Sequence, residues 1–196
     1  MKRDYCTLCQ RPQIACICHC VVQQTNTTHV VILQHPSEVN RAKGSVDLLK
    51  LSLSSCQVIV GENFDQCPEF QAVLQQYTGH LALLYPSEKA ITVDTSTTTL
   101  RHKKINCLVL LDGTWKKAYR LYMLNRVLNT LPHLALSADI VGHYSIRKTN
   151  KSGALSTLEA CCHALTVLED GSAKYQKILQ GFIKFNQLHL LFRDKK

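Results

Sequence analysis

The sequence predicts an α/β fold in which a mostly parallel sheet is flanked by helices, with a small cysteine-rich motif at the amino end. Apolar, strand-like runs alternate with helical patterns, and this alternation is typical of βαβ crossovers. The predicted strands are 29–34, 56–60, 80–85 and 105–111. The predicted helices between them are 40–53, 67–77 and 115–131. In addition, half of the ten cysteines lie within the first twenty residues.

The rest of the chain continues this pattern. A weaker apolar segment is predicted at 133–137 and helices at 156–169 and 173–192, while the Thr-rich segment 92–99 is either a short strand or an exposed loop. At 196 residues and 45% hydrophobic, the chain is long enough to bury one sizeable core. We therefore expect two regions: a metal-binding motif over residues 1–24 and an α/β domain over residues 25–196.

The distribution of charge favours a polyanionic partner. Residues 101–196 carry 16 Lys/Arg against 6 Asp/Glu, whereas residues 1–100 carry 7 against 8. Such a cluster is typical of nucleic-acid binding, because each neutralised phosphate releases counterions; a solvated basic surface is the alternative.

The chain has no run near the ~20 apolar residues of a membrane span and no apolar export segment at its amino terminus. We expect a soluble cytoplasmic protein without membrane contact.

The cysteines near the amino terminus have the spacing of a zinc site. Paired thiolates on short loops can close tetrahedrally around zinc, which prefers sulfur ligands. The expected ligands are Cys6, Cys9, Cys16 and Cys18. Cys20 or His19 is an alternative for one of them, because a spacing of one residue between two ligands is tight. Reduced cysteines without a metal are the other alternative, since a chain without an export signal is not expected to form disulfides.

The segment Asp112-Gly113-Thr114-Trp115 is the strongest indication of a reactive site. It directly follows the apolar run 105–111, and Thr114 can cap the helix that begins there. A carboxylate, a glycine and the only tryptophan of the chain are thus predicted at the carboxyl end of a strand, where open α/β sheets bind ligands. The helix opens with Lys116 and Lys117 and carries Arg120, so the acid is expected to face a basic surface.

Further polar segments are predicted at the same edge of the sheet. His35-Pro36-Ser37-Glu38 follows the first strand, where the histidine and glutamate are an acid/base pair or shape the turn. Leu84-Tyr85-Pro86-Ser87 ends the third strand. Ser156-Thr157-Leu158-Glu159 has the pattern of a capping box, and a helix start can also hold an anion. Tyr144-Ser145-Ile146-Arg147-Lys148 adds aromatic and basic groups. In a parallel sheet these segments converge on one crevice.

Taken in order, these segments resemble the DTW-domain family, tRNA-uridine aminocarboxypropyltransferases related to the SPOUT class. The resemblance runs from Cys6 to Ala160 and includes Leu111-Asp112-Gly113-Thr114-Trp115-Lys116-Lys117-Ala118. It implies S-adenosylmethionine as donor and transfer of a 3-amino-3-carboxypropyl group to N3 of a tRNA uridine, with release of methylthioadenosine. It also implies a SPOUT-like arrangement and allows a trefoil knot in the carboxyl half.

The resemblance suggests a role for each candidate residue. Asp112 is the candidate catalytic group, as the base for uridine N3 or as an orienting group. The expected cofactor contacts are Leu84, Pro86, Ser87, Leu111, Gly113, Thr114, Trp115, Leu155, Ser156 and Thr157. The expected tRNA contacts are His35, Glu38, Lys116, Lys117, Arg120, Tyr144, Arg147 and Lys148. We expect zinc to serve folding, because four cysteine ligands leave no open position for catalysis.

Two other functions fit parts of the sequence. A SPOUT-type RNA methyltransferase would use the same donor and fold, but would release S-adenosylhomocysteine. A non-catalytic, zinc-containing RNA-binding protein would account for the cysteines and the basic half. A simple RNA binder gains nothing from Asp112 within the most basic stretch, so the transferase is favoured. The identity of the tRNA and uridine and the oligomeric state do not follow from the sequence.

Overall fold

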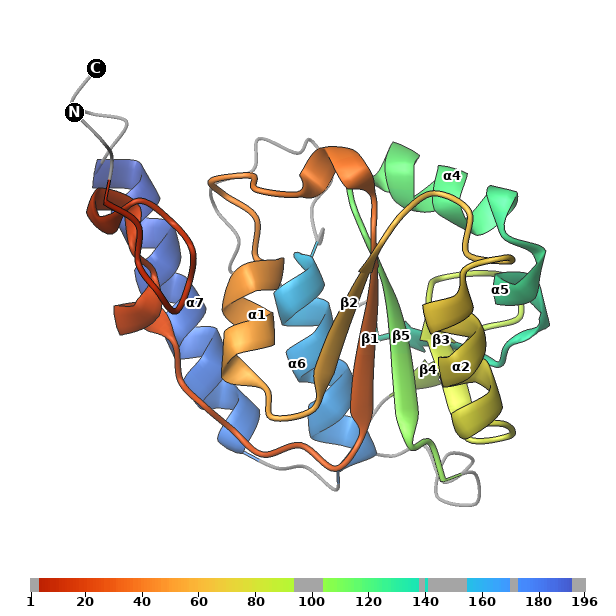
Figure 1. The fold of residues 1–196 in the computed structure, drawn as a ribbon. Coiled ribbons are helices and arrows are strands. Elements are labelled where there is room, and N and C mark those ends of the chain that lie inside the picture. Colours follow the sequence, from red (N-terminus) through yellow and green to blue (C-terminus); the bar gives the residue numbers. More distant parts are fainter. Residues whose placement is uncertain (1–3, 94–103, 138–139, 141–154, 170–172, 192–196) are drawn as a thin grey trace.

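The computed structural model describes residues 4–93, 104–137, 140, 155–169 and 173–191 (Figure 1). The strands are β1 (His29–Gln34), β2 (Cys56–Val60), β3 (Leu81–Leu84), β4 (Ile91–Val93), β5 (Cys107–Asp112) and β6 (His133–Leu136). The α-helices are α1 (Val46–Ser52), α2 (Pro68–Gln76), α4 (Trp115–Leu124), α5 (Arg126–Thr130), α6 (Thr157–Leu168) and α7 (Lys174–Leu191). Short 3-10 helices are η1 (Gln13–Ala15), η2 (Cys18–Cys20) and η3 (Pro36–Glu38).

The six strands form one sheet in the order β2-β1-β5-β3-β6-β4, and every pairing in it is parallel. This confirms the predicted α/β class. Because the strands are parallel, all of their carboxyl ends lie at one edge. The register of the central strand β5 places Asp112 opposite Gln34 on β1, and Leu110 opposite Leu84 on β3. The segments predicted to converge therefore start from neighbouring strand ends.

Alternation along the buried strands divides the core into two layers. In β1, Val30 and Ile32 pack in the cluster that contains residues of α1, α6 and α7, whereas Val31 and Leu33 pack in the cluster of α2, α4 and α5. Figure 1 shows the same division, with α1, α6 and α7 on one face of the sheet and α2, α4 and α5 on the other. The sheet is apolar on both faces, as helices covering both sides require.

The prediction of one helix over 115–131 is wrong, because the helix is interrupted at Asn125. This residue is fully buried and extended (φ −111°, ψ 100°). Its amide donates hydrogen bonds to the carbonyls of Glu62 and Leu121, and its carbonyl accepts one from the Phe64 N–H. The bonds to Glu62 and Phe64 are tertiary and hold Asn125 out of the helix. The continuous 3.6-residue pattern could not reveal these two bonds, since they join residues about 60 positions apart.

Two other boundaries differ from expectation. The helix predicted from residue 40 begins at Val46, because Asn40 adopts a left-handed conformation (φ 59°) and the chain turns before it. In the Thr-rich segment 92–99, residues 92–93 belong to β4, and the remainder lies outside the described residues. The capping box at the start of α6 is confirmed: Ser156 Oγ accepts from the Glu159 N–H, and the Glu159 carboxylate accepts from the Ser156 N–H.

The amino-terminal motif packs against α7 and α1, beside α7 in Figure 1. Arg11 forms an ion pair with Asp47 of α1 at 2.8 Å, and its guanidinium lies over the Phe185 ring of α7. Gly181 of α7 lies against the Cys20 carbonyl, where a Cβ would clash. The motif is thus part of the folded core.

None of the helices in the described part of the chain is long and apolar enough to cross a membrane. The path over 141–154, and with it the question of a knot, lies outside the described residues.

Candidate active site

A largely apolar pocket of ≈ 290 Å³ lies at the carboxyl edge of the sheet. Its walls come from the ends of β3, β5 and β6 and from the first turns of α4 and α6. The volume is near the lower end of the range for small-molecule sites, ~300–1,000 Å³. A pocket that is mostly apolar and carries a few convergent polar groups can enclose a flat organic group and orient it.

Eight of the ten predicted cofactor contacts line this pocket: Leu84, Pro86, Leu111, Gly113, Trp115, Leu155, Ser156 and Thr157. They come from three segments that are far apart in the sequence, and the parallel sheet brings them together. The side chains of the other two predicted contacts have partners within the fold. Ser87 Oγ lies 2.5 Å from His133 Nδ1, and Thr114 Oγ1 accepts from the Lys117 N–H at 3.4 Å as the cap of α4. Their contact with a ligand stays a prediction.

Asp112 ends β5 beside the pocket, and its carboxylate is held by two neighbouring elements. Oδ1 accepts a hydrogen bond from the Thr157 hydroxyl at 2.6 Å, and Oδ2 accepts one from the Gln34 amide at 2.9 Å. Gln34 ends β1 and Thr157 opens α6, so the carboxylate joins two strand ends to the start of a helix. Because Thr157 lines the pocket, Asp112 is one hydrogen bond away from a group that a ligand would contact.

A second polar network lies at the same edge, on η3, α4 and the loop after β2. Lys117 Nζ is 2.5 Å from Glu38 Oε1, and Arg120 is 3.1 Å from Glu62 Oε2. The other oxygen of Glu62 lies 3.0 Å from His35 Nε2. Lys117 and Arg120 therefore form ion pairs with Glu38 and Glu62, and His35 contacts the same Glu62 carboxylate, so four predicted tRNA contacts lie in this network. Each of the two cations shares its charge with a carboxylate, and the pairs give these long side chains defined positions.

The remaining predicted tRNA contacts are not part of this network. Lys116 is exposed on the first turn of α4. Tyr144, Arg147 and Lys148 lie outside the described residues.

Sequence analysis assigned no role to four residues that shape the site, Gln34, Glu62, Tyr85 and His133, although Tyr85 belongs to a segment that it expected there. Gln34 ends an apolar run, and only the strand register shows that it faces Asp112. Tyr85 lines the pocket and stacks on Tyr122, with ring centroids 4.4 Å apart. Behind it, His133 accepts from Ser87 at Nδ1, because its Nε2 donates to the Leu128 carbonyl at 2.8 Å. These residues act through pairings between distant segments, for which a single sequence carries no signal.

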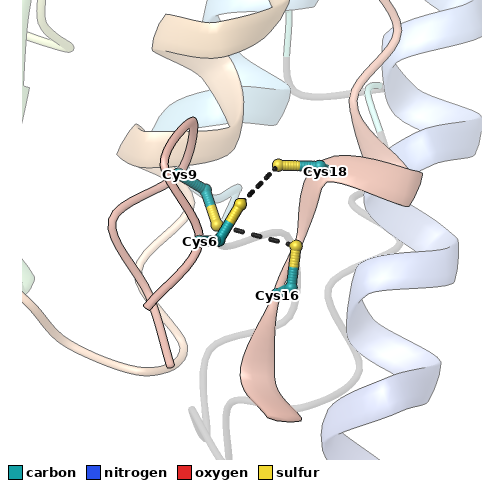
Figure 2. Close-up of side chains that lie close together, drawn as sticks. All are labelled: Cys6, Cys9, Cys16 and Cys18. Atoms are coloured by element: carbon teal, nitrogen blue, oxygen red, sulfur yellow. Dashed lines mark hydrogen bonds between the residues drawn. The ribbon is translucent and has the colours of Figure 1, made fainter. Parts of the chain in front are cut away.

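The four predicted metal ligands meet in the amino-terminal motif, beside α7 (Figure 1). The sulfur atoms of Cys6, Cys9, Cys16 and Cys18 all lie within 4.8 Å of one another (Figure 2). The Cys6–Cys18 and Cys9–Cys16 sulfur pairs are 3.5 and 3.8 Å apart. A tetrahedron with Zn–S bonds of ~2.3 Å has edges of ~3.8 Å, so the spacing fits a tetrahedral metal with four thiolates. Cys20, the alternative ligand, is buried against α7.

The backbone of the cysteine cluster supports the charged form of one ligand. Hydrogen bonds from the backbone N–H groups of Cys9 and Leu8 lower the pKa of the Cys6 thiol to about 6. A thiolate is the form that binds metal, and peptide N–H donors stabilise it. Burial raises the pKa of the Cys18 thiol to about 12, so the positions of the four sulfur atoms, more than the pKa of Cys6, give the cluster the form of a structural metal site.

The fold and the pocket define a class of protein: a parallel α/β protein whose ligand site is assembled from strand ends and one helix start. Comparison with known families identifies the family within that class. The chain belongs to the DTW domain family, whose model matches residues 3–190. The match includes the cysteine cluster and all four segments that line the pocket. No solved structure matches the chain.

The curated relatives described below are all named tRNA-uridine aminocarboxypropyltransferases. The chain is 32% identical to tRNA-uridine aminocarboxypropyltransferase 2 of Drosophila melanogaster over 176 residues, which cover 86% of this chain and 68% of that protein. It is 29% identical to tRNA-uridine aminocarboxypropyltransferase 2 of Macaca fascicularis, covering 91% of this chain and 61% of that protein. It is 25% identical to tRNA-uridine aminocarboxypropyltransferase A of Arabidopsis thaliana, covering 96% and 83%. The chain thus spans about three fifths of the Macaca protein.

Proposed function

We propose that this protein is a tRNA-uridine aminocarboxypropyltransferase that uses S-adenosylmethionine. The observation that carries the proposal is the convergence of three family segments on one pocket beside Asp112. The names of the curated relatives support the same activity. In this reaction N3 of a uridine loses its proton and forms a bond to the γ-carbon of the methionine moiety. The bond between that carbon and sulfur breaks, its electron pair neutralises the sulfonium, and methylthioadenosine leaves.

The residues of the pocket suit this donor. The apolar walls offered by Leu84, Leu111 and Leu155 would enclose the adenosine, and Trp115 offers an aromatic face at the rim. The capping box occupies the N–H groups of Ser156 and Glu159, so the N–H groups of Thr157 and Leu158 in the first turn of α6 would be the ones to favour a carboxylate such as that of the methionine moiety. Transfer of the aminocarboxypropyl group rather than methyl requires that the γ-carbon face the uridine. Rigid walls held by the network behind them favour one orientation of the donor.

Asp112 is the proposed reaction-centre residue. Its two candidate roles, base and orienting group, can be distinguished by the activity of Asp112→Asn. As a base it would take the N3 proton, and then Asp112→Asn would lose activity as completely as Asp112→Ala. As an orienting group it would hold Thr157, and then Asp112→Asn would keep part of the activity. Asparagine still has an oxygen for the Thr157 hydroxyl, and the Gln34 amide can rotate to pair with its amide nitrogen.

The test of the proposed function is incubation of the purified protein with unmodified tRNA and S-adenosylmethionine, followed by mass spectrometry of nucleosides and by-product. We expect aminocarboxypropyluridine and methylthioadenosine, both lost in Asp112→Ala. A methylated nucleoside with S-adenosylhomocysteine would show a methyltransferase instead. RNA binding without any product from total tRNA would show a non-catalytic binding protein.

We also propose that the metal held by Cys6, Cys9, Cys16 and Cys18 is Zn²⁺, supported by the four thiolates and their near-tetrahedral spacing. Elemental analysis should find one zinc per chain, lost in Cys16→Ser. Cys67→Ser is the matched control, because Cys67 lies outside the cluster and its thiol donates to Glu69. Purified protein that contains no zinc, or a Cys67→Ser variant that loses it equally, would contradict the assignment.

A further inference from the structure

The outward side of α4 carries a row of large, exposed side chains. Trp115, Tyr119 and Met123 are 51%, 57% and 57% exposed. They are spaced four residues apart, so they share one side of the helix, while Ala118 and Leu121 face the core. Single exposed apolar residues are ordinary, but three in register that include two aromatic rings form a continuous strip. We call Trp115, Tyr119 and Met123 the α4 strip.

The α4 strip begins at the mouth of the pocket. Trp115 both opens the strip and lines the pocket. Residues four apart lie ~6 Å apart along a helix axis, so the strip extends ~12 Å away from the site. Stacked nucleotides repeat every ~3.4 Å, which gives the strip room for about three bases. A substrate whose reacting base lies in the pocket would bring its neighbouring nucleotides to this surface.

The charge beside the strip favours RNA over a protein partner. Residues 115–130 contain Lys116, Lys117, Arg120 and Arg126 and no acidic residue, although Lys117 and Arg120 pair with Glu38 and Glu62 from neighbouring segments. Lys116 and Arg120 are exposed and lie on the helix next to the strip. The cores of protein–protein interfaces are depleted of charge, whereas sites for unpaired nucleic acid combine aromatic faces for bases with cations for phosphates. Tyr119 between Lys116 and Arg120 has this second composition.

We propose that the α4 strip is a stacking platform for unpaired bases of the RNA substrate that flank the target uridine. The inference rests on the proposed function, which it extends by assigning a second contact surface outside the pocket. Aromatic side chains bind bases through their faces, and a thioether such as Met123 offers a polarisable contact that adapts to different bases. The platform would hold the RNA by its neighbouring bases while the uridine occupies the pocket.

Trp115, the only tryptophan in the chain, reports on the platform directly. Titration of the protein with unmodified tRNA should quench its fluorescence and yield a Kd. In a Tyr119→Ala/Met123→Ala variant, loss of stacking should raise that Kd about ten-fold or more. The single variant Tyr119→Phe keeps both the aromatic ring and Met123, so it should retain most of the wild-type affinity for tRNA. Ile183→Ala is the control, because it removes an exposed apolar side chain of α7 and should bind as wild type.

Two further measurements separate the alternatives. The affinity for S-adenosylmethionine, measured by calorimetry without RNA, should be unchanged in the double variant. The wild type and the double variant should sediment as the same species. An unchanged Kd for tRNA in the double variant overturns the platform. A wild-type oligomer that dissociates in the variant also overturns it, because a second copy of the chain then covers the strip.

The platform and the proposed function fail in different ways. If product forms normally but the double variant keeps the wild-type KM and Kd for tRNA, the platform is wrong and the transferase stands. If no product forms but tRNA quenches Trp115 and the double variant binds it more weakly, the proposed function is wrong and the platform is supported as an RNA-binding surface.

Discussion

Among single residues, Thr157 makes the contact that joins the Asp112 carboxylate to the pocket. Its hydroxyl donates to Asp112 Oδ1 at 2.6 Å while the residue lines the ligand space. A hydrogen bond to a charged group contributes about 1.5–3 kcal/mol. Thr157→Val keeps the shape but removes the donor, so we expect a fall in kcat of about ten-fold or more. Thr157→Ser keeps the donor and should retain most activity, measured as the rate of methylthioadenosine release; equal loss in both variants would contradict this role.

His133 supports the wall of the pocket from behind, and its protonation should weaken the fold. Burial lowers the pKa of His133, and the nearby Lys89 lowers it further. The unfolded chain takes up this proton near pH ~6.5, before the folded protein does. The contribution of His133 is therefore complete above that pH and decreases as the pH falls. Urea unfolding at pH 7.5 and 5.5 should show a smaller pH dependence in His133→Gln than in wild type; the same dependence in both would show that other groups cause it.

At the scale of elements, Gly181 determines how closely the amino-terminal motif docks on α7. A Cβ at this position would collide with the Cys20 carbonyl, which is backbone and cannot easily move. Replacing glycine by alanine inside a helix normally stabilises by up to ~1 kcal/mol. Overpacking typically costs ~1–3 kcal/mol, so we expect Gly181→Ala to lower Tm despite the gain in helix propensity. A raised Tm in calorimetry of the metal-loaded protein would contradict this docking.

The elements differ in how far the sequence predicts them, and the reason is the range of the interactions involved. The strands of the central sheet follow from local apolar runs, and the start of α6 follows from the local capping box of Ser156 and Glu159. The break at Asn125 does not, because its amide bonds to a loop about 60 residues earlier in the chain. The same contrast holds in the site, where Asp112 stands out from its own segment but its partner Gln34 does not.

At the scale of the whole molecule, parallel pairing converts separate motifs into one site. A sequence indicates that polar segments follow strands, but the strand order determines which of them become neighbours. Here β5 lies between β1 and β3, so Asp112 pairs with Gln34 on one side and Leu110 pairs with Leu84 on the other. The predicted convergence depended only on the strands being parallel. The identity of each contact depended on their order and register, which local patterns do not encode.

The carboxylate of Glu169 joins the segment before β1 to the start of α7. Glu169, after α6, accepts hydrogen bonds from the N–H groups of Thr27 and Thr28 just before β1. Its other oxygen accepts from the Tyr175 hydroxyl and pairs with Lys174, both at the start of α7. Burial opposes its ionisation, but the Lys174 ammonium and these hydrogen bonds outweigh burial and lower the pKa of Glu169 to about 2.

This carboxylate should make the stability of the whole molecule depend on acid. The pKa of Glu169 is about 2 when folded and ~4.3 when unfolded, so its contribution is complete above pH ~4.3 and is lost as the pH falls towards 2. We expect Glu169→Gln to lower the free energy of unfolding by about 2 kcal/mol at pH 7, and the difference from wild type to shrink towards pH 3. Urea unfolding of both proteins measures that difference directly, so acid effects shared by them, such as loss of a bound metal, cancel. Glu88→Gln, at an exposed position, is the matched control and should change stability little at either pH. A difference for Glu169→Gln that stays constant with pH would show that the charge of Glu169 does not hold these segments together.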